Sequence, residues 1–385
     1  MAHIVAFTGH MIDRPERAVP RFPPAVEGRV ARRIGAELEQ LGATDGYASA
    51  ACGGDLLFHE AMLQRRGKIN VVLPCPAPEF REACVDIAPS GDWGARFERV
   101  LDKASSVEIL SEQCAADNAM ASECCNRVIV GLARIEARLL GQAPVVLALW
   151  DGHPGDAIGG THSMVEFCWS QAVPLRLLDE LVSHPAATAS ARPASANRST
   201  GILVARDPSQ KLGAMVFADV VKFSKLKERQ LPAFTRKYLF EIMKVCERIG
   251  AFPLVKNTWG DGLYMVFESV RDAGRFALEL CEFVVATDWS AHGLPEDFNV
   301  RIGLHAGPVY QVYDPVIGQW TYMGSHVTRA ARIGPNTPPG VVYASRTFAA
   351  LASAEGLTDV VCTYVGDIEL AKGYGVFATY RVARE

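Results

Sequence analysis

A change of composition near the middle of the chain does most to constrain the fold. Residues 182–200, VSHPAATASARPASANRST, are rich in alanine, serine and proline and contain few large apolar side chains. Such a segment cannot bury enough apolar surface to fold alone and is typical of a linker. The chain has 385 residues, enough for a domain on each side. We therefore expect a domain at 1–181, a linker at 182–200 and a second domain at 201–385.

The two halves carry different patterns. Before the linker, strand-like runs such as HIVAFTG, INVVLP and PVVLALW alternate with helical patterns, which predicts an α/β domain with a Rossmann-like parallel sheet. After it, a strand near LGAMVFADVV precedes a long helical pattern, and further strands and helices follow without regular alternation. This order predicts an α+β domain with a ferredoxin-like core.

Composition excludes several kinds of partner. The formal net charge is -4 and no long block of lysine and arginine occurs, so we expect neither nucleic acid nor membrane as a partner. No stretch approaches 18 uncharged apolar residues, and the start lacks the pattern of a signal peptide, which predicts a cytoplasmic protein. The ten cysteines form no CxxC pair, and we expect them to be reduced thiols.

Two carboxylates carry the first chemical signal. Asp219 lies in the apolar run VFADVV, and Asp261 lies between two glycines in the predicted hairpin turn NTWGDG. A buried, unpaired carboxylate is costly, and two acids that converge can bind a divalent cation. The alternative is structural, because an acid at a strand end can cap a helix and an Asp-Gly turn is common.

Several motifs favour the metal-binding interpretation. FADVVKFSKL, NTWGDGLYMVF, VRIGLHAGPVY, GSHVTRAARI and PPGVVYAS resemble, in order and spacing, the catalytic domain of class III nucleotidyl cyclases. The resemblance covers roughly residues 210 to 383. It implies an enzyme that converts a nucleoside triphosphate to its 3′,5′-cyclic monophosphate and pyrophosphate.

The resemblance also implies cofactors, a partner and residue roles. Two Mg²⁺ or Mn²⁺ ions would bind Asp219, the backbone of Val220 and Asp261, activating the ribose 3′-hydroxyl and stabilising the leaving pyrophosphate. Arg332 would stabilise charge on the α-phosphate. The enzyme would be a homodimer whose sites combine the aspartates of one chain with Arg332 of the other. Phosphate oxygens would bind the backbone where the first helix begins, at Val221, Lys222, Phe223 and Ser224.

Several positions depart from the family pattern. Asn257 and Thr321 stand where the base is recognised, and each side chain can donate or accept, so neither fixes the base. Lys256 is one residue out of register and would point to the opposite face of the strand. Thr328 replaces the asparagine that orients the ribose. The lysine for the triphosphate is assigned to Lys372, or that position is held by Tyr374 and Lys372 is a solvated turn residue.

The first half contains two glycine-rich junctions between a strand and a helix. Such junctions let a phosphate approach helix N-terminal amides, although they also serve ordinary packing. Together they resemble SLOG domains, which are nucleotide-binding folds, and this implies a nucleotide-sensing role rather than hydrolysis. The candidate residues are Gly53, Gly54 and Asp55 at the first junction and Gly159, Gly160, Thr161 and Glu166 at the second.

Three hypotheses about function remain open at this point. We favour a cyclase that uses ATP, because threonine at position 321 occurs in cyclases that use adenine. A second hypothesis is a cyclase that acts on UTP or CTP and makes a second messenger in bacterial antiphage defence. A third is a degenerate cyclase fold kept for ligand binding or dimerisation, against which the retention of both aspartates and Arg332 argues.

Overall fold

The computed structural model describes residues 3–114, 119–154, 158–178, 181 and 209–385, so the predicted linker lies outside the described residues. The first part contains a six-stranded, all-parallel sheet, as the alternating pattern predicts. The strand order is β4-β3-β2-β1-β5-β6. The strands are β1 (His3–Gly9), β2 (Ala43–Ala48), β3 (Lys68–Leu73), β4 (Ser106–Ile109), β5 (Val145–Leu149) and β6 (Leu175–Leu178).

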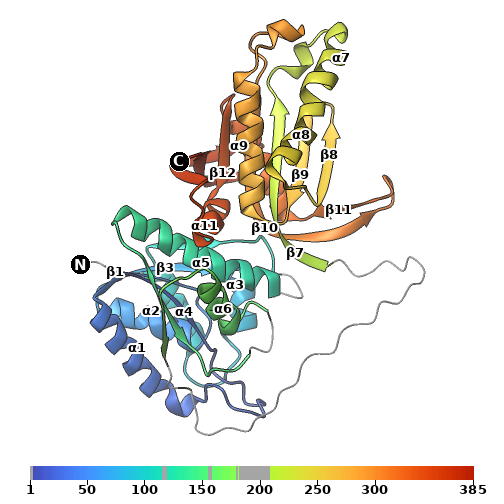
Figure 1. Ribbon diagram of the computed structural model, residues 1–385. Coiled ribbons are helices and arrows are strands. Elements are labelled where there is room, and N and C mark those ends of the chain that lie inside the picture. The colour runs from blue at the N-terminus through green and yellow to red at the C-terminus, as the bar shows by residue number, and fades with distance from the viewer. Residues whose placement is uncertain (1–2, 115–118, 155–157, 179–180, 182–208) are drawn as a thin grey trace.

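Helices cover both faces of this sheet (Figure 1). Between β1 and β5 the chain changes direction across the sheet, because β2, β3 and β4 follow on one side and β5 and β6 on the other. Such a switch point, at the carboxyl ends of parallel strands, is where open α/β sheets place ligands. The helices are α1 (Glu27–Leu41), α2 (Gly54–Gln64), α3 (Ala77–Cys84), α4 (Trp93–Lys103), α5 (Ala119–Leu139) and α6 (Thr161–Ser170), with a short 3₁₀ turn at Pro24–Val26.

The second part is α+β, as predicted, and contains an eight-stranded sheet in which β10 pairs with three neighbours, β7, β11 and β12, along its length. The main order is β13-β14-β12-β10-β7-β9-β8, and β11 pairs with the far end of β10. The strands are β7 (Ser209–Val220), β8 (Val255–Trp259), β9 (Gly262–Phe267), β10 (Val300–Asp314), β11 (Gln319–Met323), β12 (Val341–Ser345), β13 (Val361–Leu370) and β14 (Gly375–Ala383).

Helices α8 and α9 lie on one face of this sheet (Figure 1). A π-helical segment, Thr235–Leu239, joins α7 to α8 and places Tyr238 in the core. The helices are α7 (Leu231–Phe234), α8 (Phe240–Ile249), α9 (Val270–Ala286), α10 (Ser325–Ile333) and α11 (Arg346–Ala354). Short 3₁₀ helices lie at Phe223–Lys225, Glu228–Gln230, Ser290–His292 and Gly334–Asn336.

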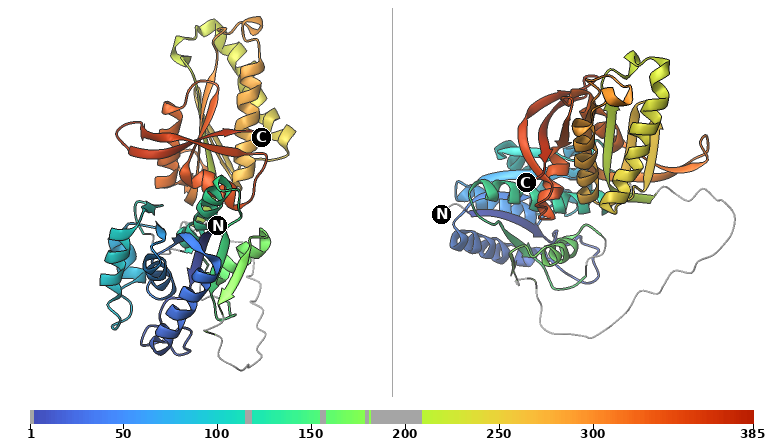
Figure 2. Two further views of the ribbon diagram at one scale, coloured as in Figure 1. Left: turned by 90° about the vertical axis from the view of Figure 1, so that its left-hand side faces the viewer. Right: turned by 45° about the horizontal axis from the view of Figure 1, so that its top comes forward.

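The two parts share one hydrophobic core through helices α5 and α11, which lie against each other (Figures 1 and 2). One face of α5 covers the parallel sheet, and the core cluster continues from Cys124 and Val128 into Phe348 and Leu351. Gly131 makes the close approach possible, because a Cβ atom there would overlap the carbonyl oxygen of Ala350. The first part therefore contacts the second through a packed helix pair.

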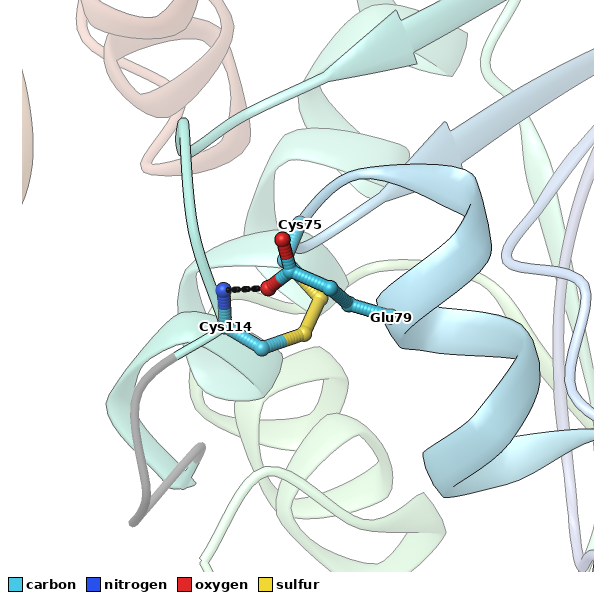
Figure 3. Close-up of a disulfide and its surroundings, with 3 residues drawn as sticks. All are labelled: Cys75, Glu79 and Cys114. Carbon is cyan, nitrogen blue, oxygen red and sulfur yellow. Dashed lines mark hydrogen bonds between the residues drawn. A yellow bond between two sulfur atoms is a disulfide. The ribbon is translucent and has the colours of Figure 1, made fainter.

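One cysteine pair corrects the expectation that all thiols are reduced. Cys75 and Cys114 form a disulfide across a sequence separation of 39 residues, with Cα atoms 5.1 Å apart (Figure 3). Cys75 follows β3 and Cys114 follows β4, and these strands are neighbours in parallel register. The pairing depends on the sheet, which sequence spacing did not reveal. The other eight cysteines are free.

Candidate active site

Strand pairing brings Asp219 and Asp261 to one place. Asp219 is next to last in β7, and Asp261 occupies the turn between β8 and β9. Because β7 and β9 are antiparallel neighbours, with Ala218 opposite Leu263, the end of β7 lies beside that turn. The carboxylate of Asp261 accepts a hydrogen bond from the backbone of Val220. Burial raises the pKa of Asp261, and the nearby charge of Asp219 adds to the effect.

Asp219 is not the isolated buried carboxylate that the sequence suggested. Its side chain is 34% exposed, and Arg301 of β10 pairs with both of its oxygens. One of these contacts, from Nε to Oδ1, measures 3.2 Å. Arg301 is the residue directly opposite Asp219 in the antiparallel β7–β10 register. A countercharge therefore already compensates Asp219, and sequence reasoning missed it because the two residues are 82 positions apart.

The oxygen donors at this place suit a hard divalent cation. Two carboxylates and the main-chain carbonyl of Val220 offer the ligands that Mg²⁺ and Mn²⁺ prefer. Tyr238 lies in the core nearby, and its hydroxyl is one of several buried polar atoms that have no hydrogen-bond partner among the described residues. Among the described residues, no cluster of three or more histidine, cysteine, aspartate or glutamate side chains could hold a metal.

The predicted phosphate-binding turn differs from expectation. No long helix begins there, because Phe223–Lys225 and Glu228–Gln230 are single 3₁₀ turns and α7 starts only at Leu231. The amide of Val221 donates to the carbonyl of Asn299 at 2.9 Å, so this amide is already used. Lys222 has a left-handed backbone and its Nζ contacts Asp297 at 2.6 Å. Ser224 is exposed beside these residues.

The two base-recognition candidates lie on different strands. Asn257 of β8 lies opposite Tyr264 of β9, and the hydroxyl of Tyr264 donates to the carbonyl of Tyr322, next to Thr321 of β11. Lys256 reaches Met243 of α8 with its Nζ, 3.6 Å from the sulfur. Lys256 therefore lies toward the helical layer, as its register predicted.

Helix α10 carries Thr328 and Arg332 one turn apart. Thr328 is exposed and Arg332 is half-buried, while His326, Arg329 and Ile333 of the same helix are buried. In the described part of the chain, no hydrogen bond or ion pair joins Arg332 to either aspartate of the same chain. The helix begins after Gly324, whose φ of 138° is strained for other residues.

No contact among the described residues supports Lys372 as the lysine that binds the triphosphate. Lys372 is exposed, with a φ of 64°, in the turn between β13 and β14. The hydroxyl of Tyr374 donates to Glu112 of the first part of the chain. Tyr374 is thus engaged in an interdomain contact.

A second candidate site lies at the switch point of the parallel sheet. A cavity of about 640 Å³ opens at the carboxyl ends of β1, β2 and β3 and reaches the start of α5. This cavity brings together four of the residues predicted from the sequence to bind a nucleotide: Asp55, Gly159, Gly160 and Thr161. Further polar or charged lining residues, which sequence reasoning missed, are Thr8, His10, Asp13, Arg14, Glu16, Arg17, Arg21, Ser49, Ser122 and Asn126.

The other predicted residues, Gly53, Gly54 and Glu166, are not among the residues that line this cavity. Gly53, with a φ of 97°, packs against the main chain of Met11 and Ile12, and Gly54 packs against Gly9. These glycines serve close packing, the alternative that the sequence left open. Glu166 is exposed and pairs with His162 at 3.5 Å. Asp55, which does line the cavity, is buried, and burial raises its pKa to about 7.

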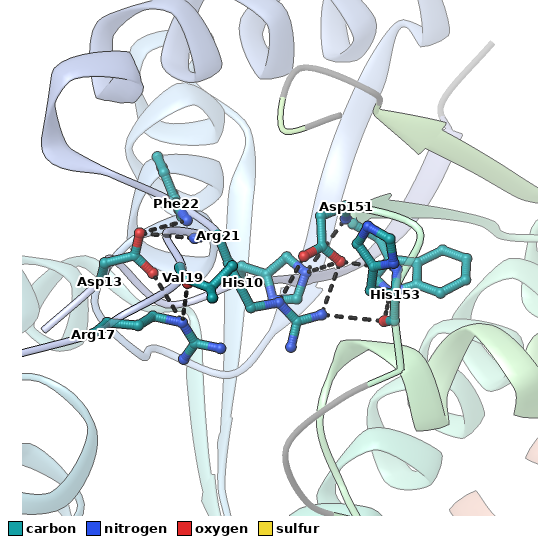
Figure 4. Close-up of polar contacts among 9 residues, drawn as sticks. His10, Asp13, Arg17, Val19, Arg21, Phe22, Asp151 and His153 are labelled. Carbon is teal, nitrogen blue, oxygen red and sulfur yellow. Dashed lines mark hydrogen bonds and ion pairs between the residues drawn. The ribbon is translucent and has the colours of Figure 1, made fainter. Parts of the chain in front are cut away.

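A polar network forms one rim of the cavity (Figure 4). The guanidinium of Arg21 holds Asp151 by two contacts, of 2.6 and 2.8 Å, and His10 approaches the same carboxylate at 3.1 Å. Burial alone would raise the pKa of Asp151, but hydrogen bonds from Arg21 and His153 lower it well below its usual range. Asp13 accepts the amides of Arg21 and Phe22 at 2.9 Å, which fixes the loop that follows β1.

Comparison with known proteins supports the prediction of a cyclase-type domain in the second part of the chain. Residues 207–384 match the family model described as the adenylate and guanylate cyclase catalytic domain. A putative serine/threonine-protein kinase/receptor, R826, of Acanthamoeba polyphaga mimivirus is 26% identical over 178 residues. That match covers 40% of this chain and only 11% of the viral protein's length.

Solved structures match the same part. The guanylate cyclase domain of RhGC from Catenaria anguillulae, in complex with GTP, is 23% identical, with a TM-score of 0.40, covering 46% of this chain and 99% of that one. The adenylyl cyclase CyaB from P. aeruginosa is 18% identical, with a TM-score of 0.40, covering 47% and 97%. Within the described residues, no helix is long and apolar enough to cross a membrane. On the family match, residues 207–384 form a class III adenylate and guanylate cyclase-type catalytic domain.

Proposed function

We propose that the protein is a nucleotidyl cyclase that converts a nucleoside triphosphate, preferably ATP, to the 3′,5′-cyclic monophosphate and pyrophosphate. The observation that carries the proposal is the convergence of Asp219 and Asp261 within a domain that matches the cyclase model. In the reaction the ribose 3′-oxygen loses its proton and bonds to the α-phosphorus, while the bond to the pyrophosphate oxygen breaks.

The side chains divide this work. Asp219, Asp261 and the carbonyl of Val220 would hold two divalent cations, Mg²⁺ or Mn²⁺, which when bound lower the pKa of the 3′-hydroxyl and neutralise the triphosphate. Arg301 must then share or release Asp219, because it occupies both carboxylate oxygens. Arg332 would donate to the α-phosphate where negative charge develops, and Thr328 would contact the ribose. Asn257 and Thr321 would contact the base, and the backbone near Ser224 and the side chain of Lys372 the phosphates.

We propose that the active unit is a homodimer. Among the described residues, no hydrogen bond or ion pair joins Arg332 to the aspartates of its own chain, which supports a site completed by a second copy. The hairpin of β10 and β11 extends beyond the sheet and exposes apolar side chains suited to such a contact. These exposed side chains are Tyr313, Val316, Ile317, Trp320 and Met323.

We further propose that residues 1–181 form a nucleotide-sensing domain, joined by the linker 182–200 to the cyclase domain at 201–385. The cavity at the switch point supports this role, since the N-terminal end of α6 and Arg14 line it beside Arg17 and Arg21, which pair with Asp13 and Asp151. A phosphate-bearing ligand fits this chemistry.

The test is incubation of the purified chain with ATP, GTP, CTP and UTP, each with Mn²⁺ or Mg²⁺, followed by identification of the product. We expect cyclic AMP as the main product, and Asp219→Asn and Asp261→Asn to abolish it. Asp288→Asn, an exposed acid after α9, is the control and should keep wild-type activity. Cyclic UMP or CMP as the main product would support the pyrimidine hypothesis. No product from any nucleotide would support a degenerate domain.

A further inference from the structure

Five residues of the first domain, Glu108 to Glu112, hold several elements of the cyclase domain. The carbonyl of Leu110 accepts a hydrogen bond from Nη1 of Arg329 at 3.2 Å, and Oγ of Ser111 lies 2.9 Å from Nε2 of His326. Both contacts are buried and both end on α10. Glu108 pairs with Arg346 at the start of α11, at 3.2 Å.

The contact of Ser111 continues as a buried polar chain. Nδ1 of His326 lies 2.9 Å from Nε2 of His305, and Nδ1 of His305 lies 2.6 Å from Oγ of Ser345. The two imidazole rings stack, with centroids 5.1 Å apart. Gly307 makes room for the His326 ring, because a Cβ atom at that position would overlap it. The chain thus connects strand β10, helix α10 and the N-cap of α11 to the first domain.

Burial disfavours the charged form of both histidines. Burial lowers the pKa of His326 to about 3, assisted by the charge of Arg329, and burial holds the pKa of His305 far below its usual value. Each neutral ring has one N–H donor and one acceptor nitrogen. The chain can therefore satisfy every nitrogen only if a hydroxyl is present at each end, at Ser111 and at Ser345. Removal of the Ser111 hydroxyl leaves Nε2 of His326 unpaired in the protein interior, which is costly.

The anchored face of α10 lies opposite its proposed functional face. His326, Arg329 and Ile333 are buried, whereas Thr328 is exposed and Arg332 half-buried. At 3.6 residues per turn, Thr328 and Arg332 lie on one side of the helix, turned away from His326. Any rotation or shift of α10 on its anchored side would move the guanidinium of Arg332 relative to the α-phosphate.

We propose that Ser111 and His326 are positioning residues for the cyclase reaction: through their hydrogen bond the first domain fixes helix α10, and with it Arg332, in the orientation needed for catalysis. The proposal rests on the cyclase function proposed above. It makes a residue outside the cyclase domain part of the arrangement of the active site, and it predicts an effect on kcat that substrate binding does not share.

The test compares four full-length variants by kcat, KM and thermal unfolding. Ser111→Ala should lower kcat about tenfold, because α10 loses a buried contact and Arg332 is held less precisely, with KM within about twofold. Ser111→Thr keeps the hydroxyl and should restore most of kcat. His326→Gln keeps an amide near the Ser111 hydroxyl but gives up His305, and should be intermediate. Glu108→Gln weakens a contact of the same segment that ends on α11, and should leave kcat within about twofold.

The outcomes separate this proposal from the proposed function. A wild-type protein that cyclises no nucleotide overturns both. An active wild-type protein whose kcat is unchanged in Ser111→Ala overturns the positioning role alone, even if the melting temperature falls. The same applies if Glu108→Gln lowers kcat as much as Ser111→Ala does, because interdomain packing in general would then explain the effect.

Discussion

At the scale of single residues, Tyr238 is one of several buried residues with a polar atom that lacks a hydrogen-bond partner in the described part of the chain. Its ring packs against Phe234 and Phe298, with centroids 5.2 and 5.5 Å away, while its hydroxyl has no hydrogen-bond partner among the described residues. Burial raises the pKa of Tyr238, and the charges of Asp219 and Asp261 raise it further, which places the hydroxyl near the candidate metal site. An unpaired buried hydroxyl costs about 1–3 kcal/mol. A catalytic role is one explanation for a buried polar group that lacks a partner.

We therefore expect Tyr238→Phe to raise the free energy of unfolding by about 1 kcal/mol and to lower cyclase activity. Tyr264→Phe is the matched control, because the Tyr264 hydroxyl donates to the Tyr322 carbonyl at 3.1 Å and its loss should destabilise the protein. Thermal unfolding and initial rates of both variants provide the measurement. A lower melting temperature in Tyr238→Phe would contradict the prediction.

Asp55 predicts a dependence of stability on pH. Burial raises its pKa from the ordinary aspartate range to about 7, so between these values the folded state binds a proton that the unfolded chain has released. This contribution to stability is fully present below about pH 4 and is lost as the pH rises through 7. Asp55→Asn removes the ionisation, so the melting temperature of the variant minus that of the wild type should increase from pH 5 to pH 8. A difference that is constant across this range would refute the assignment.

At the scale of elements, the close crossing of α5 and α11 joins the two domains. Gly131 faces the main chain of Ala350, and Arg134, one turn later, donates to the carbonyls of Ser353 and Ala354 at 3.2 and 2.7 Å. Two helices can approach so closely only where one of them lacks a side chain at the contact.

We expect Gly131→Ala to destabilise the protein by about 1–3 kcal/mol or more, because the methyl group must displace α11. Gly35→Ala in α1 is the control, since a Cβ atom there has no neighbour within 4 Å and alanine favours the helix. Calorimetry should show a lower melting temperature for the first variant and an equal or higher one for the second. Equal behaviour of the two variants would mean that α5 and α11 do not pack as described.

At the scale of the whole molecule, the proposed homodimer predicts complementation. Asp219→Ala and Arg332→Ala should each be inactive, but in a mixture one site of the heterodimer combines an intact Asp219 with an intact Arg332. Because only half of the dimers are mixed at equilibrium and each has one intact site, about a quarter of wild-type activity should return. If subunit exchange is demonstrated and activity stays absent, both residues act within one chain.

The sequence alone determined the broad organisation of the protein. Periodicity predicted the parallel sheet of the first part, because alternating strand and helix patterns depend on local side-chain spacing. Ordered motifs identified the cyclase-type domain, because residues that bind a shared ligand recur at characteristic spacings. The side on which Lys256 lies followed from strand register, since successive side chains of a strand alternate.

Only the tertiary structure decided how distant groups meet. Arg301 lies opposite Asp219, Cys75 bonds to Cys114, and Ser111 reaches His326 across 215 positions of the chain. It also showed that the glycines after β2 serve packing and that the turn after β7 begins no long helix. These contacts arise from strand neighbours and from helices packed between two sheets. Sequence spacing does not encode them, because hydrogen bonds and ion pairs depend on distance in space.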